Sequence, residues 1–307
     1  MAIQENIEFK TLDGSVLRGW LFLTSTKGPG IVMTPGFNFP IGELYHEVAL
    51  KFQQAGITVL VYDPRCVGLS DGMPRYDINP AKQTEDLSDA ITFLKTKPTV
   101  DPQRVALWGY SLSAAEALAA AGLDRRVKLV VAVCPAPRPY EMETPAKRKK
   151  YLELAIRDRE SQARGRGPFY LQFIGDSDET ALLNFRKQRG MEELDYDFVM
   201  EGLSKIPNFR NEITAQTLYR IAAWAFDGVP RDVGETPVLQ VYAVGEEYEH
   251  IRKAQDAIWD ALTGPKERHY EQERGHLDIL TNDGHRFDKL MKVQIDFVLK
   301  HLGEGMR

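Results

Sequence analysis

Cysteine is scarce in this chain, where only Cys66 and Cys134 occur among 307 residues. Two cysteines cannot build the disulfide framework on which many small secreted domains depend, and we expect two reduced thiols rather than a bridge. The sequence also lacks an Asn-x-Ser/Thr glycosylation site, and its first ten residues, MAIQENIEFK, lack the apolar segment of a signal peptide. These absences predict a reduced, cytoplasmic setting.

Long apolar runs, positive net charge and nucleotide or metal signatures are missing as well. No apolar run reaches the roughly 18 residues that a membrane-spanning helix needs. With a net charge of -5 and an isoelectric point near 5.8, the chain has no electrostatic reason to bind nucleic acid. No G-x-G-x-x-G, G-x-x-x-x-G-K-[ST], H-E-x-x-H or C-x-x-C pattern occurs. We therefore expect no cofactor, no metal, and neither nucleic acid nor a membrane as a partner.

The apolar pattern that is present indicates an α/β protein. Two antiparallel strands are predicted over 7–23, around the turn Asp13-Gly14-Ser15. Further strands are predicted at 30–34, 58–62, 105–108, 127–133, 238–243 and 268–272. Helical stretches separate most of them, which favours an eight-stranded, mostly parallel sheet with helices on both faces.

A long insertion interrupts this pattern, because residues 134–237 contain no segment that reads as a good strand. Amphipathic helices are predicted over 182–191 and 213–225. We interpret 138–232 as a helical cap inserted in a core made of 1–137 and 233–307, since such insertions are usually functional. An independent small domain is the alternative.

A candidate nucleophile stands at the junction between a strand and a helix. The pentapeptide Gly109-Tyr110-Ser111-Leu112-Ser113 follows the strand at 105–108 and precedes an alanine-rich helix. This context turns a weak G-x-S-x-G pattern into a nucleophile elbow, with Ser111 held in a strained turn. Small residues are required two positions away on each side, and Ser113 stands where the second glycine is usual.

The base that activates a serine should follow the last strand of the sheet. Six histidines are available, and four are disfavoured by chain order or by their place in a predicted element: His46, His250, His269 and His301. His276 follows the last predicted strand directly, after a glycine that permits a tight loop. We therefore predict His276 as the catalytic base, with His285 as the fallback.

The acid that orients this base should lie just past the strand at 238–243. The loop after it offers glutamates and no aspartate. Counting from the end of the strand favours Glu246 as the triad acid, and Glu247 is the alternative. A carboxylate there would hold the tautomer of the histidine and stabilise its cation.

Two backbone N–H groups are predicted to form an oxyanion hole. One belongs to Leu112, the residue after the nucleophile, and the other to Phe37, in the loop that follows the strand at 30–34. The loop at 63–72 contains Arg65 and several aspartates, which we interpret as structural ion pairs. Cys66 in that loop has no predicted acid–base partner and is a poor candidate nucleophile.

With these pieces in order, the sequence resembles the α/β-hydrolase superfamily over nearly its whole length. More narrowly it resembles the fungal polyketide transferase-like branch, on the Ser111-Leu112-Ser113 elbow and the Gly275-His276-Leu277-Asp278 ending. The resemblance implies acyl transfer or hydrolysis on a polyketide-like substrate in secondary metabolism. The chain departs from the usual pattern at Ser113, at the glutamate acid and at Cys66, where a glycine is usual.

The expected function is that of a cofactor-free serine hydrolase or acyltransferase. It would act through an acyl-enzyme on an ester, thioester or lactone of an apolar, polyketide-like small molecule. One alternative is a cyclase or condensation catalyst that uses the same pocket with His276 as a proton shuttle. Another is a catalytically silent binding protein. The oligomeric state stays open, with a homodimer among the options.

Overall fold

A computed structural model describes residues 3–138, 145–175, 181–184, 196–246 and 248–303. An eight-stranded sheet forms its centre, in the order β1-β2-β4-β3-β5-β6-β10-β11. The strands are β1 (Ile3–Lys10), β2 (Val16–Leu23), β3 (Gly28–Thr34), β4 (Thr58–Tyr62), β5 (Val100–Tyr110), β6 (Val127–Val133), β10 (Val238–Ala243) and β11 (Lys266–Glu271). Strand β2 pairs antiparallel with both β1 and β4, and the remaining pairs are parallel. The predicted eight-stranded sheet with an antiparallel start is confirmed.

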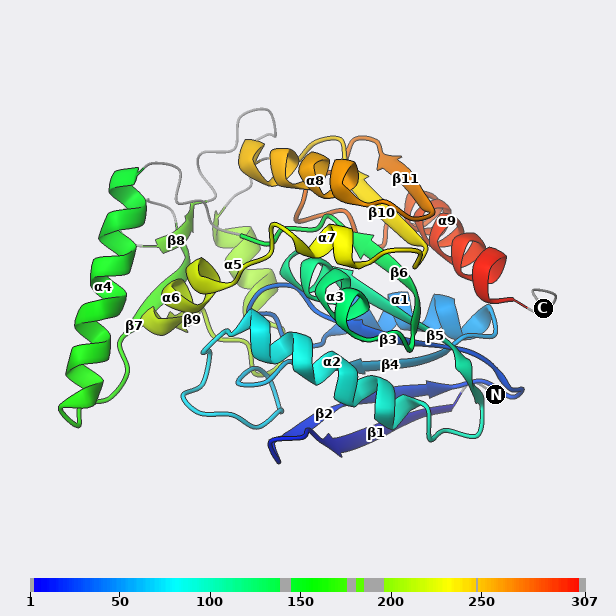
Figure 1. The fold of residues 1–307 in the computed structure, drawn as a ribbon, viewed down its shortest axis with the longest axis horizontal. Helices are drawn as coiled ribbons and strands as arrows, with labels where there is room; N and C mark the ends of the chain where they lie inside the picture. The colour runs from blue at the N-terminus through cyan, green and yellow to red at the C-terminus, as the bar shows by residue number, and fades with distance from the viewer. Residues whose placement is uncertain (1–2, 139–144, 176–180, 185–195, 247, 304–307) are drawn as a thin grey trace.

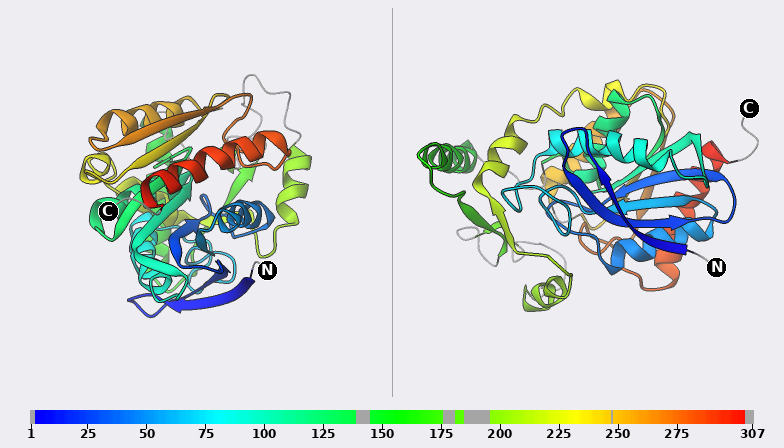
Figure 2. Two further views of the ribbon diagram at one scale, coloured as in Figure 1. Left: turned by 90° about the vertical axis from the view of Figure 1, so that its right-hand side faces the viewer. Right: turned by 90° about the horizontal axis from the view of Figure 1, so that it is seen from below.

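Helices cover both faces of this sheet (Figures 1 and 2). On one face, α1 (Glu43–Gln54) and α9 (His285–Leu302) pack against apolar side chains of the strands. On the other face lie α2 (Pro80–Leu94), α3 (Leu112–Leu123) and α8 (Glu249–Ala261). Strands β3 and β4 are buried along their whole length, as a sheet covered on both sides requires.

The helices begin where local sequence favours it. Helix α2 starts with Pro80 directly after the N-cap Asn79, whose side chain accepts a hydrogen bond from the N–H of Lys82 at 3.4 Å. Ten of the twelve residues of α3 are alanine, leucine or glycine, and the small side chains among them let this helix pack closely against α2 and β5. This close packing sets the position of the elbow at its first turn.

The inserted segment lies beside the end of the sheet where α2 and α3 begin (Figure 1). It contains α4 (Pro145–Ala163), α5 (Tyr196–Ser204), α6 (Ala215–Ala223) and the short α7 (Val229–Asp232). It also contains a second sheet of order β8-β7-β9, made of β7 (Tyr170–Gly175), β8 (Ala181–Asn184) and β9 (Glu212–Thr214).

This second sheet corrects the prediction of an all-helical insertion. The helix predicted over 182–191 is wrong at 182–184, which form β8, and 185–191 lie outside the described residues. The helix predicted over 213–225 is confirmed for Ala215–Ala223, whereas Ile213 and Thr214 belong to β9. Pairing with β7 supplies the backbone hydrogen bonds of both short strands, and their sequences alone carry too few residues to show the alternation of a strand.

Both cysteines are buried, and neither takes part in a disulfide, as expected. Within the part of the chain that the structure describes, no helix combines the length and apolarity needed to cross a bilayer.

Candidate active site

Ser111 occupies a sharp turn between the end of β5 and the start of α3. Its φ of 59° and ψ of -121° lie in a region that residues with side chains rarely adopt. A Cβ added at Gly109 would overlap the backbone of Ser113 and Ala114, so the close crossing of strand and helix requires glycine there. The predicted elbow is present, with its strain localised on the candidate nucleophile.

The three predicted triad side chains meet at this turn. The His276 Nε2 atom lies 2.9 Å from Ser111 Oγ, and its Nδ1 atom lies 2.9 Å from Glu246 Oε2. All three residues are buried, at 5% exposure for Ser111 and His276 and 3% for Glu246. The imidazole therefore joins the hydroxyl to the carboxylate in a continuous relay, away from bulk water.

Glu246 is held by neighbours that the sequence analysis did not single out. Gln255, on α8, donates from Nε2 to Glu246 Oε2 at 3.2 Å, and Arg252 donates to the Glu246 carbonyl at 2.6 Å. Both partners follow in the next helix and carry no motif that could have marked them. Glu247, the alternative acid, lies outside the described residues.

Hydrogen bonds hold the loop that carries His276 in place on both sides. Tyr110 donates a hydrogen bond from its hydroxyl to the His276 carbonyl. The N–H of Gly275 donates to Asp278 Oδ1 at 2.6 Å, which closes a tight turn around the histidine. His285, the fallback base, is exposed at the first residue of α9.

The loop after β3 lies directly against the elbow. A Cβ added at Gly36 would be 3.4 Å from Ser111 Cβ, and the Gly36 N–H donates to the hydroxyl of Tyr45 at 3.1 Å. The Phe39 N–H donates to the Gly36 carbonyl, closing a turn in which Asn38 has a φ of 59°. Phe37 is buried within this turn, and Leu112 opens α3, where the first N–H groups have no acceptor in the helix.

The inserted segment contacts this same turn. The Asn38 side chain donates to the Glu212 carbonyl at 3.1 Å. The rings of Phe37 and Phe39 meet Phe173, on β7, with centroids 5.1 and 5.8 Å apart. These contacts belong to an apolar cluster that joins the insertion to the site: Phe37, Val67, Ile78, Leu112, Tyr151, Phe173, Ile174, Leu182, Ile213, Leu218 and Ile221.

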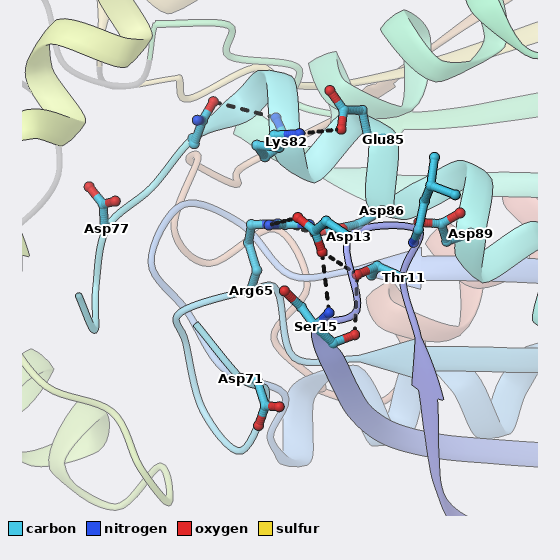
Figure 3. Close-up of polar contacts among 12 residues, drawn as sticks. Thr11, Asp13, Ser15, Arg65, Asp71, Asp77, Lys82, Glu85, Asp86 and Asp89 are labelled. Atoms are coloured by element: carbon cyan, nitrogen blue, oxygen red, sulfur yellow. Dashed lines mark hydrogen bonds and ion pairs between the residues drawn. The ribbon is translucent and has the colours of Figure 1, made fainter. Parts of the chain in front are cut away.

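The charged loop at 63–72 is structural, as interpreted from its sequence. Arg65 points to Asp86 on α2 and Asp13 (Figure 3), donating from Nε to Asp86 Oδ2 at 2.7 Å and from Nη1 to Asp13 Oδ2 at 2.9 Å. Asp63 accepts from the N–H groups of Ile41 and Leu69, both at 2.7 Å. Burial raises the pKa of the Cys66 thiol to about 11, which keeps it protonated and unsuited to nucleophilic attack.

One group of side chains near the triad has the composition of a metal site. Single ligand atoms of Cys134, Glu246 and His276 all lie within 4.8 Å of one another. Two of the three are the members of the relay that hydrogen-bond to each other. A divalent cation bound there would replace the hydrogen bond that orients the imidazole, so metal binding and the relay are mutually exclusive.

Known proteins share both the sequence and this architecture. The sequence profile of the alpha/beta hydrolase family matches residues 31–289. The thiohydrolase apmlB of Arthrinium phaeospermum is 72% identical over 308 residues and covers 100% of both chains. The polyketide transferase af380 of Aspergillus fumigatus is 39% identical over 300 residues, which cover 97% of this chain and 99% of that protein.

Solved structures agree with these sequence matches. DcsB, solved in complex with its substrate analogue, superposes with a TM-score of 0.86 at 33% identity, over 97% of this chain and 100% of that one. The α/β hydrolase GrgF from Penicillium sp. sh18 gives a TM-score of 0.81 at 34% identity, over 98% and 99% of the two chains. The chain belongs to the α/β hydrolase family. Within that family its relatives carry the names polyketide transferase and thiohydrolase, which confirms the narrower resemblance seen in the sequence.

Proposed function

We propose that the protein is a serine hydrolase or acyltransferase that cleaves an acyl ester or thioester through an acyl-enzyme. The observation that carries this proposal is the unbroken Ser111–His276–Glu246 relay, with both contacts at 2.9 Å and the serine in a strained turn. A hydroxyl hydrogen-bonded to an oriented imidazole is the arrangement that activates a serine for attack on a carbonyl carbon.

The chemistry follows from the positions of the atoms. Ser111 Oγ attacks the acyl carbon while His276 Nε2 accepts its proton, and Glu246 stabilises the resulting imidazolium. The N–H groups of Phe37 and Leu112 are proposed to donate to the oxyanion of the tetrahedral intermediate. The imidazolium then protonates the departing thiol or alcohol. Water, or another acceptor hydroxyl, repeats the sequence and releases the acyl group.

The proposed substrate is an apolar acyl compound of polyketide-like chemistry. Its support is the apolar cluster that lines the junction between the insertion and the elbow, in which Phe37, Phe173 and Leu112 are buried. The names of the relatives, thiohydrolases and polyketide transferases, agree with a thioester or ester of such a compound. We further propose that 138–232 acts as the cap over this site, and that the reaction takes place in the cytoplasm, in agreement with two reduced thiols.

A labelling experiment tests the nucleophile directly. Purified protein is incubated with a fluorophosphonate probe and with a medium-chain acyl thioester, and labelling and thiol release are followed. Ser111→Ala is expected to lose labelling and to reduce turnover by roughly 10⁶-fold. Ser204→Ala, at the exposed end of α5, is the matched control. Equal labelling of wild type and Ser111→Ala would contradict the proposal. Turnover retained in Ser111→Ala but lost in His276→Ala would replace the acyl-enzyme by a proton-shuttle mechanism.

A further inference from the structure

Ser113 and Glu116 form a buried polar pair beneath the elbow. Both lie in the first turns of α3, at 3% and 2% exposure. Ser113 Oγ lies in hydrogen-bond contact with the carbonyl oxygen of Pro35, the residue that precedes Gly36 and Phe37. It also lies 3.1 Å from Glu116 Oε2. The pair therefore connects the helix that carries Leu112 to the loop that carries Phe37.

Counting protons assigns the direction of these hydrogen bonds. A serine hydroxyl has one proton, and a backbone carbonyl can only accept. The closer contact is to Pro35, so the Ser113 proton is directed to that carbonyl. If Glu116 were ionised, neither its Oε2 atom nor the Ser113 oxygen would have a proton to donate to the other. The second contact is a hydrogen bond only when Glu116 itself carries the proton.

The surroundings of Glu116 favour the same protonation state. Its other oxygen, Oε1, has no hydrogen-bond partner among the described residues, which a carboxylate in an apolar environment could not tolerate without a large cost. The ionised group whose charge acts on it is Asp86, from α2, whereas Tyr62, on β4, stays neutral because burial raises its pKa. Asp86 is paired with Arg65 as a carboxylate (Figure 3), so it disfavours a second negative charge nearby. Burial, the largest cause, raises the pKa of Glu116 to about 8.

We propose that Glu116 is a positioning residue for the oxyanion hole. As a neutral acid it donates to Ser113 Oγ, which donates to the Pro35 carbonyl and fixes the loop of Phe37 against the first turn of α3. The two N–H donors are thereby held at a constant separation. This role explains why a serine replaces the second glycine of the elbow. A glycine has no hydroxyl and could bond neither to Pro35 nor to Glu116. The inference rests on the proposed function.

Kinetic variants separate this role from simple packing. Ser113→Ala and Glu116→Leu are expected to lower kcat about tenfold with KM nearly unchanged. Ser113→Ala removes the hydrogen bond to the Pro35 carbonyl, and Glu116→Leu removes the donor that orients the Ser113 hydroxyl. Glu116→Gln keeps a neutral donor of similar shape and is expected to stay within about threefold of wild type. The double variant Ser113→Ala/Glu116→Leu should match Ser113→Ala alone, since Glu116 acts through Ser113. Glu85→Gln, an exposed glutamate on α2, is the control.

The pH profile supplies a readout that packing alone would not change. As pH rises through the pKa of Glu116, ionisation removes the donor, so wild-type kcat should fall on the alkaline side. The Glu116→Gln profile should lack this fall. Equal kcat in wild type, Ser113→Ala and Glu116→Leu would overturn the proposal, as would a Glu116→Gln variant as slow as Glu116→Leu.

Infrared difference spectra between wild type and Glu116→Gln test the protonation state without any substrate. At neutral pH the wild type should show the carbonyl stretch of a neutral carboxylic acid that the variant lacks, and loss of that band above the pKa. A missing band at neutral pH would overturn the role of Glu116. A band that is present in a protein without thioesterase activity would instead refute the proposed function.

Discussion

Tyr110 donates a hydrogen bond from its hydroxyl to the backbone carbonyl of His276, and the two rings lie with centroids 5.4 Å apart. Tyr110 precedes the proposed nucleophile Ser111, and His276 is the proposed base. The elbow therefore positions the histidine loop directly, in addition to presenting the serine. Strand β5 and the loop after β11 meet at this bond, although the two residues are 166 positions apart in the chain.

Tyr110→Phe should lower kcat with little change in KM. The variant keeps the ring and loses the hydroxyl, so the His276 carbonyl loses its donor and the loop loosens. A hydrogen bond of this kind is worth about 1 kcal/mol, which corresponds to roughly a fivefold to tenfold loss. Steady-state thioester hydrolysis measures it. Tyr270→Phe, at a half-exposed tyrosine on β11, is the control. An unchanged kcat in Tyr110→Phe would show that the loop does not need this bond.

The two glutamates considered for the acid should differ sharply. Glu246→Gln removes the charge that orients His276 and stabilises its cation, so we expect kcat to fall by roughly 10³- to 10⁴-fold. Glu247→Gln should retain wild-type activity. Rates of fluorophosphonate labelling, compared with thioester turnover, measure both variants. A slow Glu247→Gln together with an active Glu246→Gln would reverse the assignment.

Gly109→Ala should fail to form a native elbow. The added Cβ meets backbone atoms of Ser113 and Ala114 rather than a flexible side chain, so strand and helix must separate. We expect a loss of about 3 kcal/mol or more in the free energy of unfolding, and loss of activity in any folded protein. Urea denaturation followed by circular dichroism measures the first effect. Gly202→Ala, where the added atom meets open space on α5, should change neither quantity.

Asp63 should make stability depend on pH in the acidic range. Burial raises the pKa of Asp63 to about 6, above its ordinary value of 3.8. The folded state therefore binds the proton more tightly than the unfolded state, and stability falls as pH rises from about 4 to about 6. A shift of about two pKa units corresponds to about 3 kcal/mol.

Asp63→Asn isolates this contribution, because an amide does not titrate. The difference in unfolding free energy between wild type and Asp63→Asn, measured in urea at several pH values, should decrease by up to about 3 kcal/mol across that window. The variant also turns an amide N–H toward one of the N–H groups of Ile41 and Leu69, which adds a constant loss at every pH. A difference independent of pH would show that Asp63 titrates normally.

Much of the site could be predicted from chain order alone. Parallel strands end at one edge of the sheet, so residues just past 105–110, 238–243 and 266–271 must meet there. This reasoning places Ser111, Glu246 and His276 together without any knowledge of their side-chain contacts. The residues that fix the acid, such as Gln255, could not be predicted in this way. Gln255 reaches Glu246 from the second turn of α8, and that approach depends on how the helix packs.

The insertion was less predictable, for a physical reason. Strand β8 is four residues long and β9 is three, so neither shows a period from which to recognise it. Each is stabilised by its pairing with β7, which is a tertiary property. The protonation state of Glu116, beside Ser113, also could not be predicted from the sequence. The sequence shows that a serine replaces the usual glycine. That this serine donates its proton to the Pro35 carbonyl can be seen only in the folded structure, where the two residues lie side by side.

The hydrogen bond from Asn38 to the Glu212 carbonyl limits how this protein can diversify. Asn38 is adjacent to Phe37, so the insertion and the turn at 36–39 share a boundary, where the rings of Phe39 and Phe209 stack with centroids 5.6 Å apart. An insertion transplanted from a relative would lack the turn that matches it, and we expect it to disturb the proposed oxyanion donor at Phe37. Grafts intended to change substrate range should therefore move 36–40 together with 138–232. Substrate range and reaction rate would then change together whenever these two segments are exchanged.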